Sequence, residues 1–384
     1  MPEIEKLIQS INAESGDYEA KTQLLNLLIN ILRRLKGKIS RKDAETINAF
    51  TLTELKRLVP AVQNKIDANA PYKEKNVLFE YRDILLSLFM ISSGGPQNVK
   101  QDEIELIDSL NELIRKETVV ENAVIKLFDH STIVKSDVDV FVKSVEYIYD
   151  IYQIGIIYSG LFHYREKIAK FEADAKTALA DFIVKNINSV LERDADEDVL
   201  LLLEYAADIC VYFPCNEIIN LLQRILKTQF NRPRYYAVDS LLTLKAPVDK
   251  STVCELANDP SVASLLYSCL AKHGKLDLYP KELINEEYLA KSDLINWLSY
   301  PTELGKMPNE IELIGKAKIK KAIYHIFKYT SDSDTLTDDL KNKWLIGWSC
   351  IEDGGTFSNF DKLSDYEKNT PEKTVKYITK KLIK

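Results

Sequence analysis

The sequence predicts a mainly α-helical protein built from helix pairs, followed by a small C-terminal α+β module. From about residue 3 to residue 291, apolar residues recur at spacings of three and four, which is the period of an amphipathic helix. Only 12 Gly and 12 Pro occur in 384 residues, so the breaks between helices are expected to be short. After Pro301 the pattern changes to short runs rich in Ile, Tyr, Phe and Trp, which favour strands.

The first predicted region, residues 1–95, is helical. Leu25 and Leu28 belong to an apolar series that occupies one helix face. Pro60 is predicted to interrupt a helix, because proline removes a backbone donor. The segment Ser92–Pro96 contains two glycines and is predicted to be the loop that ends this region.

The second predicted region, residues 96–300, is an array of helices. Ile107 and Leu110 share a face, and Asp102 precedes that run where an acid favours a helix N-terminus. The most apolar tract, Ile151–Phe162, is shorter than the roughly 20 residues that a membrane span needs. We therefore expect a buried helix there and no membrane partner.

A weak internal repeat lies within this array. The segment Ala206–Val211 aligns with Ala237–Leu242 at a spacing of 31 residues, and a third copy, Leu265–Leu270, follows at a spacing of 28. Each unit contains one helix, a turn and a second helix, which is the composition of a solenoid repeat.

The stretch Arg234–Leu242, with Ala237 and Leu241, resembles the "R-x-x-A-x-x-x-L" helix of the HEAT-like (armadillo/HEAT-type) α-solenoid proteins. The dipeptide Asp259-Pro260 resembles the "D-P" that opens the next repeat in that family. The resemblance is clearest over residues 196–275 and implies an α-solenoid, without implying a particular activity.

The third predicted region, residues 301–384, is the α+β module. Three runs are expected to form strands: Ile311–Ile319, Ala322–Thr330 and Lys343–Ile351. Gly354-Gly355 is expected to form a turn. Thr370 is positioned to cap a closing helix, which is expected to cover one side of a mainly antiparallel sheet.

Several classes of chemistry find no support in the sequence. The chain has 51 Lys and Arg against 58 Asp and Glu, a net charge of −7, which makes nucleic acid an improbable partner. It contains neither a phosphate-binding glycine loop nor a nucleophile elbow nor a zinc-protease motif. We therefore predict no catalytic residues and no cofactor.

No metal site is predicted either. Asp194–Asp198 has Val and Tyr at the positions where a calcium loop needs Gly and Glu, and Cys210 and Cys215 lack the second pair of a zinc site. The histidines are interpreted as helix-end or surface residues: His130, His163, His273 and His325. The odd number of cysteines favours reduced thiols and a cytoplasmic protein: Cys210, Cys215, Cys254, Cys269 and Cys350.

Candidate partner-binding residues come from clusters of Arg and aromatic side chains, which are enriched at interface hot spots. The basic tract Arg33–Lys42 is interpreted as a solvated helix end rather than a binding site. Trp348 is expected on the outer surface of the C-terminal module. The candidates are Arg232, Arg234, Tyr235, Trp297, Tyr300 and Trp348.

These observations favour a non-enzymatic protein-interaction scaffold or adaptor with a protein or peptide partner. One alternative is a HEAT-like DNA-binding enzyme of the DNA glycosylase type, which would need a basic groove lined with aromatic residues. Another is an acidic inhibitory or immunity-type partner of a basic protein. The sequence does not separate this last possibility from a general scaffold.

Overall fold

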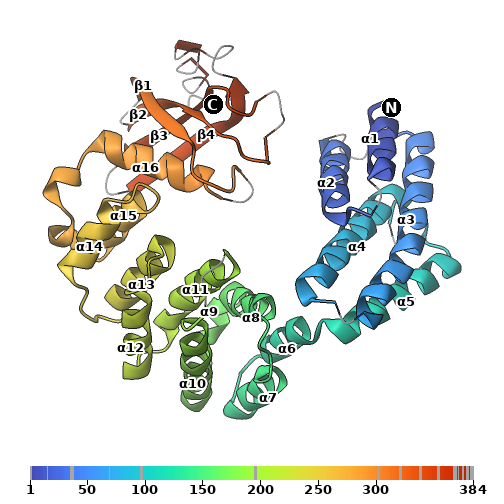
Figure 1. Ribbon diagram of the computed structural model, residues 1–384, viewed down its shortest axis with the longest axis horizontal. Coiled ribbons are helices and arrows are strands. Elements are labelled where there is room, and N and C mark those ends of the chain that lie inside the picture. Colours follow the sequence, from blue (N-terminus) through green and yellow to red (C-terminus); the bar gives the residue numbers. More distant parts are fainter. Residues whose placement is uncertain are drawn as a thin grey trace. The chain divides into compact units, whose positions relative to one another are not determined.

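The chain divides into two compact units (Figure 1). Unit 1 comprises residues 1–129 and 143–157, and unit 2 comprises residues 130–142 and 158–384. The C-terminal sheet belongs to the same unit as the helices before it. The structure, a computed structural model, describes residues 2–14, 16–34, 39–68, 70–95, 98–193, 197–300, 303–319, 322–336, 340–352, 355–365, 370, 372–373, 376–377 and 380.

Unit 1 is helical. Its complete helices are α1 (Pro2–Ala13), α2 (Tyr18–Arg34), α3 (Arg41–Asp67), α4 (Tyr72–Ser93), α5 (Gln101–Glu117) and α6 (Val119–Phe128). Helices α7 (Lys135–Val145) and α8 (Ile151–His163) contribute residues to both units. The apolar faces of α1–α5 form one core, in which Leu25, Leu28 and Leu110 are buried as the spacing predicts. Gly94 ends α4 in the left-handed conformation that glycine favours (φ 76°).

The predicted break at Pro60 is wrong, because α3 continues through it. Loss of the backbone donor in a helix interior costs about 3 kcal/mol. Leu55, Leu58 and Val62 lie on both sides of the proline and are all buried in the core of unit 1. Burial of these side chains offsets the cost of the proline, so packing overrides local propensity here.

A buried ion pair joins α2 to α3 inside unit 1. Lys21 Nζ lies 2.8 Å from Glu54 Oε2, and the hydroxyl of Tyr81 on α4 donates to the same oxygen at 2.6 Å. Arg57 donates to Glu54 Oε1 at 2.7 Å. Burial raises the pKa of Glu54, but the hydrogen bonds from Lys21, Tyr81 and Arg57 outweigh it and leave the pKa below its ordinary value.

We expect Glu54→Ala to lower the free energy of unfolding by about 3 kcal/mol or more, because it leaves the buried ammonium of Lys21 without its carboxylate. Urea unfolding followed by far-UV circular dichroism measures this loss. Glu45→Ala is the matched control, because Glu45 pairs with Arg41 at an exposed surface, where such pairs contribute about 0–1 kcal/mol. Equal losses in the two variants would contradict the prediction.

Unit 2 begins with a second set of helices. They are α9 (Arg165–Ile168), α10 (Ala173–Val190), α11 (Glu197–Ile209), α12 (Asn216–Ile225), α13 (Asn231–Thr243), α14 (Lys250–Ala257), α15 (Ala263–Lys272) and α16 (Glu286–Leu298), with short 3₁₀ turns at Cys210–Tyr212, Leu276–Leu278 and Lys281–Leu283. Helix α13 packs against both α11 and α15, and α12 packs against both α10 and α13. Pro233 occupies the first turn of α13, where proline is tolerated.

The tract predicted to be a buried helix, Ile151–Phe162, coincides with α8. Within it Ile154, Ile157, Tyr158 and Leu161 are buried. Among the described residues, none of the helices combines the length and the apolarity that crossing a bilayer requires.

The C-terminal part of unit 2 is a four-stranded antiparallel sheet whose strands follow one another in chain order: β1 (Glu310–Ile319), β2 (Ala322–Thr330), β3 (Leu345–Glu352) and β4 (Gly355–Asp365). The first three strands match the predicted runs to within two residues. The fourth strand was not among the predicted runs, and only a turn at Gly354-Gly355 was predicted at its start. Its pairing with β3 extends from Glu352–Gly355 to Leu345–Asp365.

Helix α16 covers one face of this sheet (Figure 1). Ala290, Leu294 and Leu298 form a buried cluster with Phe327 and Tyr329 of β2 and with Leu345 of β3. A Cβ atom at Gly347 would lie only 3.1 Å from both Leu294 Cδ atoms. Glycine inside β3 therefore permits the close approach of the helix to the strand.

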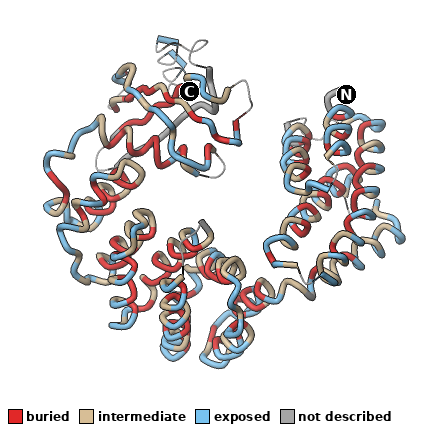
Figure 2. Tube along the Cα trace, in the orientation of Figure 1, coloured by how far each residue is buried: buried red, intermediate tan, exposed pale blue. Residues whose placement is uncertain are grey.

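The prediction that Trp348 lies on an outer surface is wrong. Trp348 is only 2% exposed, in the apolar cluster on the sheet face opposite α16, together with Tyr324, Ile326 and Ile346. Its ring lies 6.1 Å from that of Tyr377. Both faces of the sheet are therefore buried over part of their area. Figure 2 shows the buried residues along the strands.

The predicted closing helix falls mostly outside the described residues. The described residues 372–373, 376–377 and 380 are helical. The backbone N–H of Lys373 donates to Thr370 Oγ1 at 3.5 Å, which agrees with the predicted N-cap.

The prediction that His325 lies at a helix end or on the surface is also wrong. It sits in β2, fully buried on the α16 side of the sheet, opposite Lys316 of β1 and Ser349 of β3. Burial lowers the pKa of His325, and the facing charge of Lys316 lowers it further. Glu286 and Glu287 oppose this shift without cancelling it.

This burial predicts that acid destabilises unit 2. The unfolded chain protonates His325 near pH 6.5, whereas the folded chain does so only at lower pH, so the free energy of unfolding decreases as the pH falls below about 6.5. We expect His325→Leu to show a smaller drop in melting temperature between pH 7.5 and pH 5 than the parent chain. His130→Gln, at an exposed site, should leave the drop unchanged. An identical drop in the parent and in His325→Leu would refute this interpretation.

Candidate functional site: an aromatic patch beside Arg232

Two aromatic side chains lie exposed at the C-terminal end of α16. Trp297 is 44% exposed and Tyr300 is 41% exposed, and their ring centroids are 6.1 Å apart. The guanidinium of Arg232 lies 5.4 Å from the centroid of the Tyr300 ring. We call these three residues, Trp297, Tyr300 and Arg232, the aromatic patch. The structure thus brings together residues predicted separately from two segments more than 60 positions apart.

Arg232, in the first turn of α13, fixes the position of this patch. Its Nε and Nη2 donate to the two carboxylate oxygens of Glu204 on α11, at 2.9 and 3.3 Å. Its Nη1 donates to Asn296 Oδ1 on α16 at 3.0 Å. Bidentate pairs of this kind hold a guanidinium in one orientation. Arg232 therefore joins α11, α13 and α16 and stacks against Tyr300.

The bonds of Arg232 determine what the patch can recognise. Each of the three guanidinium nitrogens donates one hydrogen bond to a protein oxygen, and Glu204 compensates the positive charge. This compensation weakens the attraction of Arg232 for a phosphate. What the patch offers to a partner is therefore the exposed ring surface of Trp297 and Tyr300, a feature that protein interfaces use.

The other candidates lie away from the patch. Arg234 is largely buried, donates to Asn231 Oδ1 at 3.0 Å and pairs with Glu255 on α14. Tyr235 packs edge-to-face on Tyr236, with ring centroids 5.1 Å apart. Burial raises the pKa of Tyr235, as do nearby Cys269 and Asp239. These residues connect helices within unit 2, and Trp348 is part of the sheet core.

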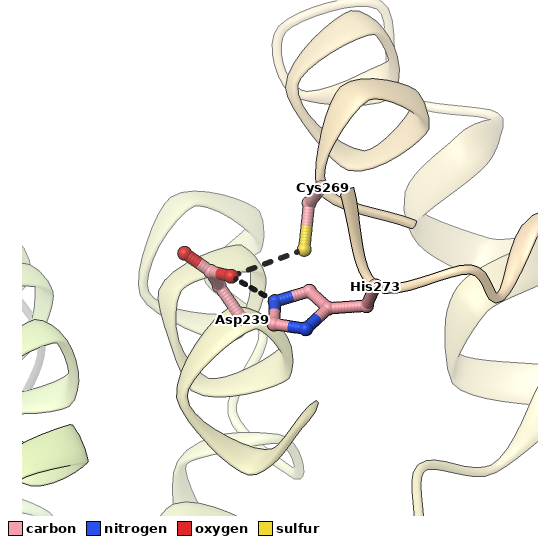
Figure 3. Close-up of side chains that lie close together, drawn as sticks. All are labelled: Asp239, Cys269 and His273. Atoms are coloured by element: carbon pink, nitrogen blue, oxygen red, sulfur yellow. Dashed lines mark hydrogen bonds and ion pairs between the residues drawn. The ribbon is translucent and has the colours of Figure 1, made fainter. Parts of the chain in front are cut away.

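A second cluster of chemically active side chains lies between α13 and α15 (Figure 3). Asp239 Oδ1 on α13 lies 2.8 Å from His273 Nε2, and Cys269 Sγ donates to the same oxygen at 3.4 Å. Asp239 and His273 are partly exposed, with 29% and 17% of their side-chain surface accessible, whereas Cys269 is buried. The three donor atoms lie within 4.8 Å of one another.

Sequence reasoning missed this cluster. It interpreted Cys269 as a reduced thiol and His273 as a helix-end or surface residue, and His273 does occupy the C-cap of α15. The available signal was the spacing Cys269-x₃-His273, which places both side chains on one helix face. The contribution of Asp239 depends on packing between α13 and α15, which spacing alone does not reveal.

The remaining candidates gain no support. The segment Asp194–Asp196 and the positions 35–38 of the basic tract lie outside the described residues. Arg41 and Lys42, at the end of that tract, pair with Glu45 and Glu5 at exposed positions. All five cysteines are free thiols, as predicted.

Comparison of the chain with protein-family models, with curated proteins and with solved structures gives no match. The resemblance of residues 196–275 to HEAT-like repeats therefore remains a prediction from the sequence.

Proposed function

We propose that this chain is a non-enzymatic protein-interaction scaffold whose partner binds at the aromatic patch. The observation that carries the proposal is the exposure of Trp297 and Tyr300 beside the internally bonded Arg232. Trp, Tyr and Arg dominate the hot spots of protein interfaces. Because Glu204 compensates Arg232, the patch favours a protein partner that contributes apolar side chains over a nucleic acid.

We further propose that the helices of unit 2 form a HEAT-like α-solenoid. Support comes from the packing of α13 between α11 and α15, the three helices that carry the aligned segments. The aligned positions Cys210, Leu241 and Cys269 are all buried, each at most 4% exposed. Solenoids present extended binding surfaces, which suits a scaffold. The five free thiols favour a reducing compartment such as the cytoplasm.

The proposal is tested by placing a photo-crosslinking amino acid at position 297 in the full chain and identifying the crosslinked protein from the source cells. Binding of that protein is then measured for the parent chain and for the double variant Trp297→Ala/Tyr300→Ala. We expect the double variant to bind at least about 30-fold more weakly, because the loss of even one hot-spot ring costs about 2 kcal/mol of binding free energy.

Tyr149→Ala is the matched control, because Tyr149 is 74% exposed but belongs to unit 1. It should bind like the parent chain. Unchanged circular dichroism in all variants would show that the fold is retained. Equal affinity of the parent and the double variant, or the absence of any protein crosslinked at position 297, would contradict the proposal. Binding of DNA at low salt that depends on Trp297 would instead support the DNA-binding alternative.

A further inference from the structure

We propose that Asp239, Cys269 and His273 form a zinc site that connects α13 to α15, with a water molecule as the fourth ligand. This inference does not depend on the proposed function, because it rests on a different set of side chains (Figure 3). Thiolate, imidazole and carboxylate are the three side-chain ligand types that zinc takes in proteins, and a mixed set with a thiolate disfavours calcium and magnesium.

Two of the three distances between ligand atoms are close to those around a tetrahedral ion, and the third, from Cys269 Sγ to His273 Nε2, is within 4.8 Å. Zinc lies about 2.3 Å from a sulfur ligand and about 2.0–2.1 Å from a nitrogen or oxygen ligand. In tetrahedral geometry, two ligand atoms of the same ion are then about 3.5 Å apart for S and O and about 3.3 Å apart for N and O. The Cys269 Sγ–Asp239 Oδ1 distance is 3.4 Å, and the His273 Nε2–Asp239 Oδ1 distance is 2.8 Å. Zinc therefore requires the His273 ring to move away from the carboxylate by about 0.5 Å.

The supporting elements suit a preformed site. Cys269 and His273 are four residues apart at the end of α15, and Asp239 lies in the second half of α13, so two packed helices hold all three ligands. The partly exposed Asp239 and His273 provide access for the ion and for its water ligand. The buried Cys269 provides the ligand that the solvent reaches least.

The same three residue types also occur in cysteine-dependent catalysis, but the arrangement here disfavours that reading. A catalytic cysteine needs a histidine as its base and a lowered pKa. Here the carboxylate of Asp239 lies between the thiol and the imidazole and accepts from the thiol. Burial raises the pKa of Cys269, and Asp239 raises it further.

Coordination by a thiolate makes metal uptake depend on pH. Zinc binds the deprotonated sulfur, so binding releases the proton of Cys269, and we expect the affinity for zinc to decrease as the pH is lowered.

Cobalt(II) is the direct probe, because tetrahedral coordination by a thiolate gives d–d absorption and a thiolate-to-cobalt charge-transfer band. The full chain, first treated with a chelator, should bind one Co²⁺ with both bands, and Zn²⁺ should displace it. Cys269→Ser should lose the charge-transfer band. His273→Asn and Asp239→Asn should each weaken Co²⁺ binding by more than about 100-fold. Even the loss of a residue that only hydrogen-bonds to a metal ligand typically lowers metal affinity by 10–100-fold.

Cys254→Ser is the matched control, because Cys254 is a partly exposed thiol on the neighbouring helix α14, and it should keep both bands. A second readout needs no variant: Zn²⁺ should slow the alkylation of Cys269, measured by mass spectrometry, but not that of Cys254. Absence of a thiolate–cobalt band in the parent chain, or a band that persists in Cys269→Ser, would overturn the proposal and leave the cluster as a hydrogen-bonded contact.

Discussion

Leu241→Asp should destabilise unit 2 by more than about 4 kcal/mol. Leu241 is completely buried in α13, which packs against α11 and α15. Shortening a buried leucine side chain to alanine lowers the free energy of unfolding by about 2–5 kcal/mol. The new carboxylate adds the penalty of burying an unpaired charge. A domain with a typical stability of 5–15 kcal/mol would lose a large part of it.

Tryptophan fluorescence measures this effect specifically, because Trp297, Trp344 and Trp348 all belong to unit 2. Thr243→Asp is the matched control, since Thr243 is an exposed residue of the same helix and surface changes usually alter stability by less than about 1 kcal/mol. An unchanged melting temperature for Leu241→Asp would show that the apolar face of α13 is assigned wrongly.

The period of apolar residues predicted most helices correctly because each helix buries one continuous face. The apolar residues that include Leu25 and Leu28 correctly predicted which face of α2 is buried in the core. The apolar tract Ile151–Phe162 correctly predicted α8. Pro60 misled the prediction because backbone propensity acts locally, whereas the burial of Leu55 and Val62 on either side of it depends on helices that come from elsewhere in the chain.

The sheet illustrates a different limit of sequence reasoning. Two-residue alternation correctly separated the two faces of β2, one with His325 and Phe327 and the other with Tyr324 and Ile326. Alternation does not reveal whether the second face is covered. Trp348 was therefore placed on a surface, although it packs in a cluster and lies beside Tyr377 from the end of the chain.

The candidate sites depended on contacts between distant segments. Trp297, Tyr300 and Arg232 were chosen by residue type, but only the fold shows that Arg232 is compensated by Glu204 and stacks on Tyr300. This changes its expected role from a direct partner contact to a support that holds the exposed rings in place. The zinc site was missed for the same reason, because its third ligand comes from a different helix.

Truncation of the chain after Tyr300 should abolish soluble expression of the fragment. The sheet covers the face of α16 that carries Ala290, Leu294 and Leu298, and Gly347 lets Leu294 approach the strand closely. In the full chain, Ser349 Oγ donates to Asp293 Oδ2 at 2.9 Å, so removal of the sheet also removes a hydrogen-bond donor to a buried acid. The 1–300 fragment would expose this apolar face to water, and such patches cause aggregation.

Soluble yield and size-exclusion chromatography of residues 1–300 and of the full chain test this prediction. A 1–300 fragment that also carries Leu294→Gln and Leu298→Gln is the matched comparison, and it should be more soluble than the unmodified fragment if the exposed face of α16 causes the aggregation. A monomeric 1–300 fragment that melts cooperatively would show that the helices do not need the sheet. In that case the sheet would be an independent appendage, and a role in binding a partner would be favoured over a role in capping the array.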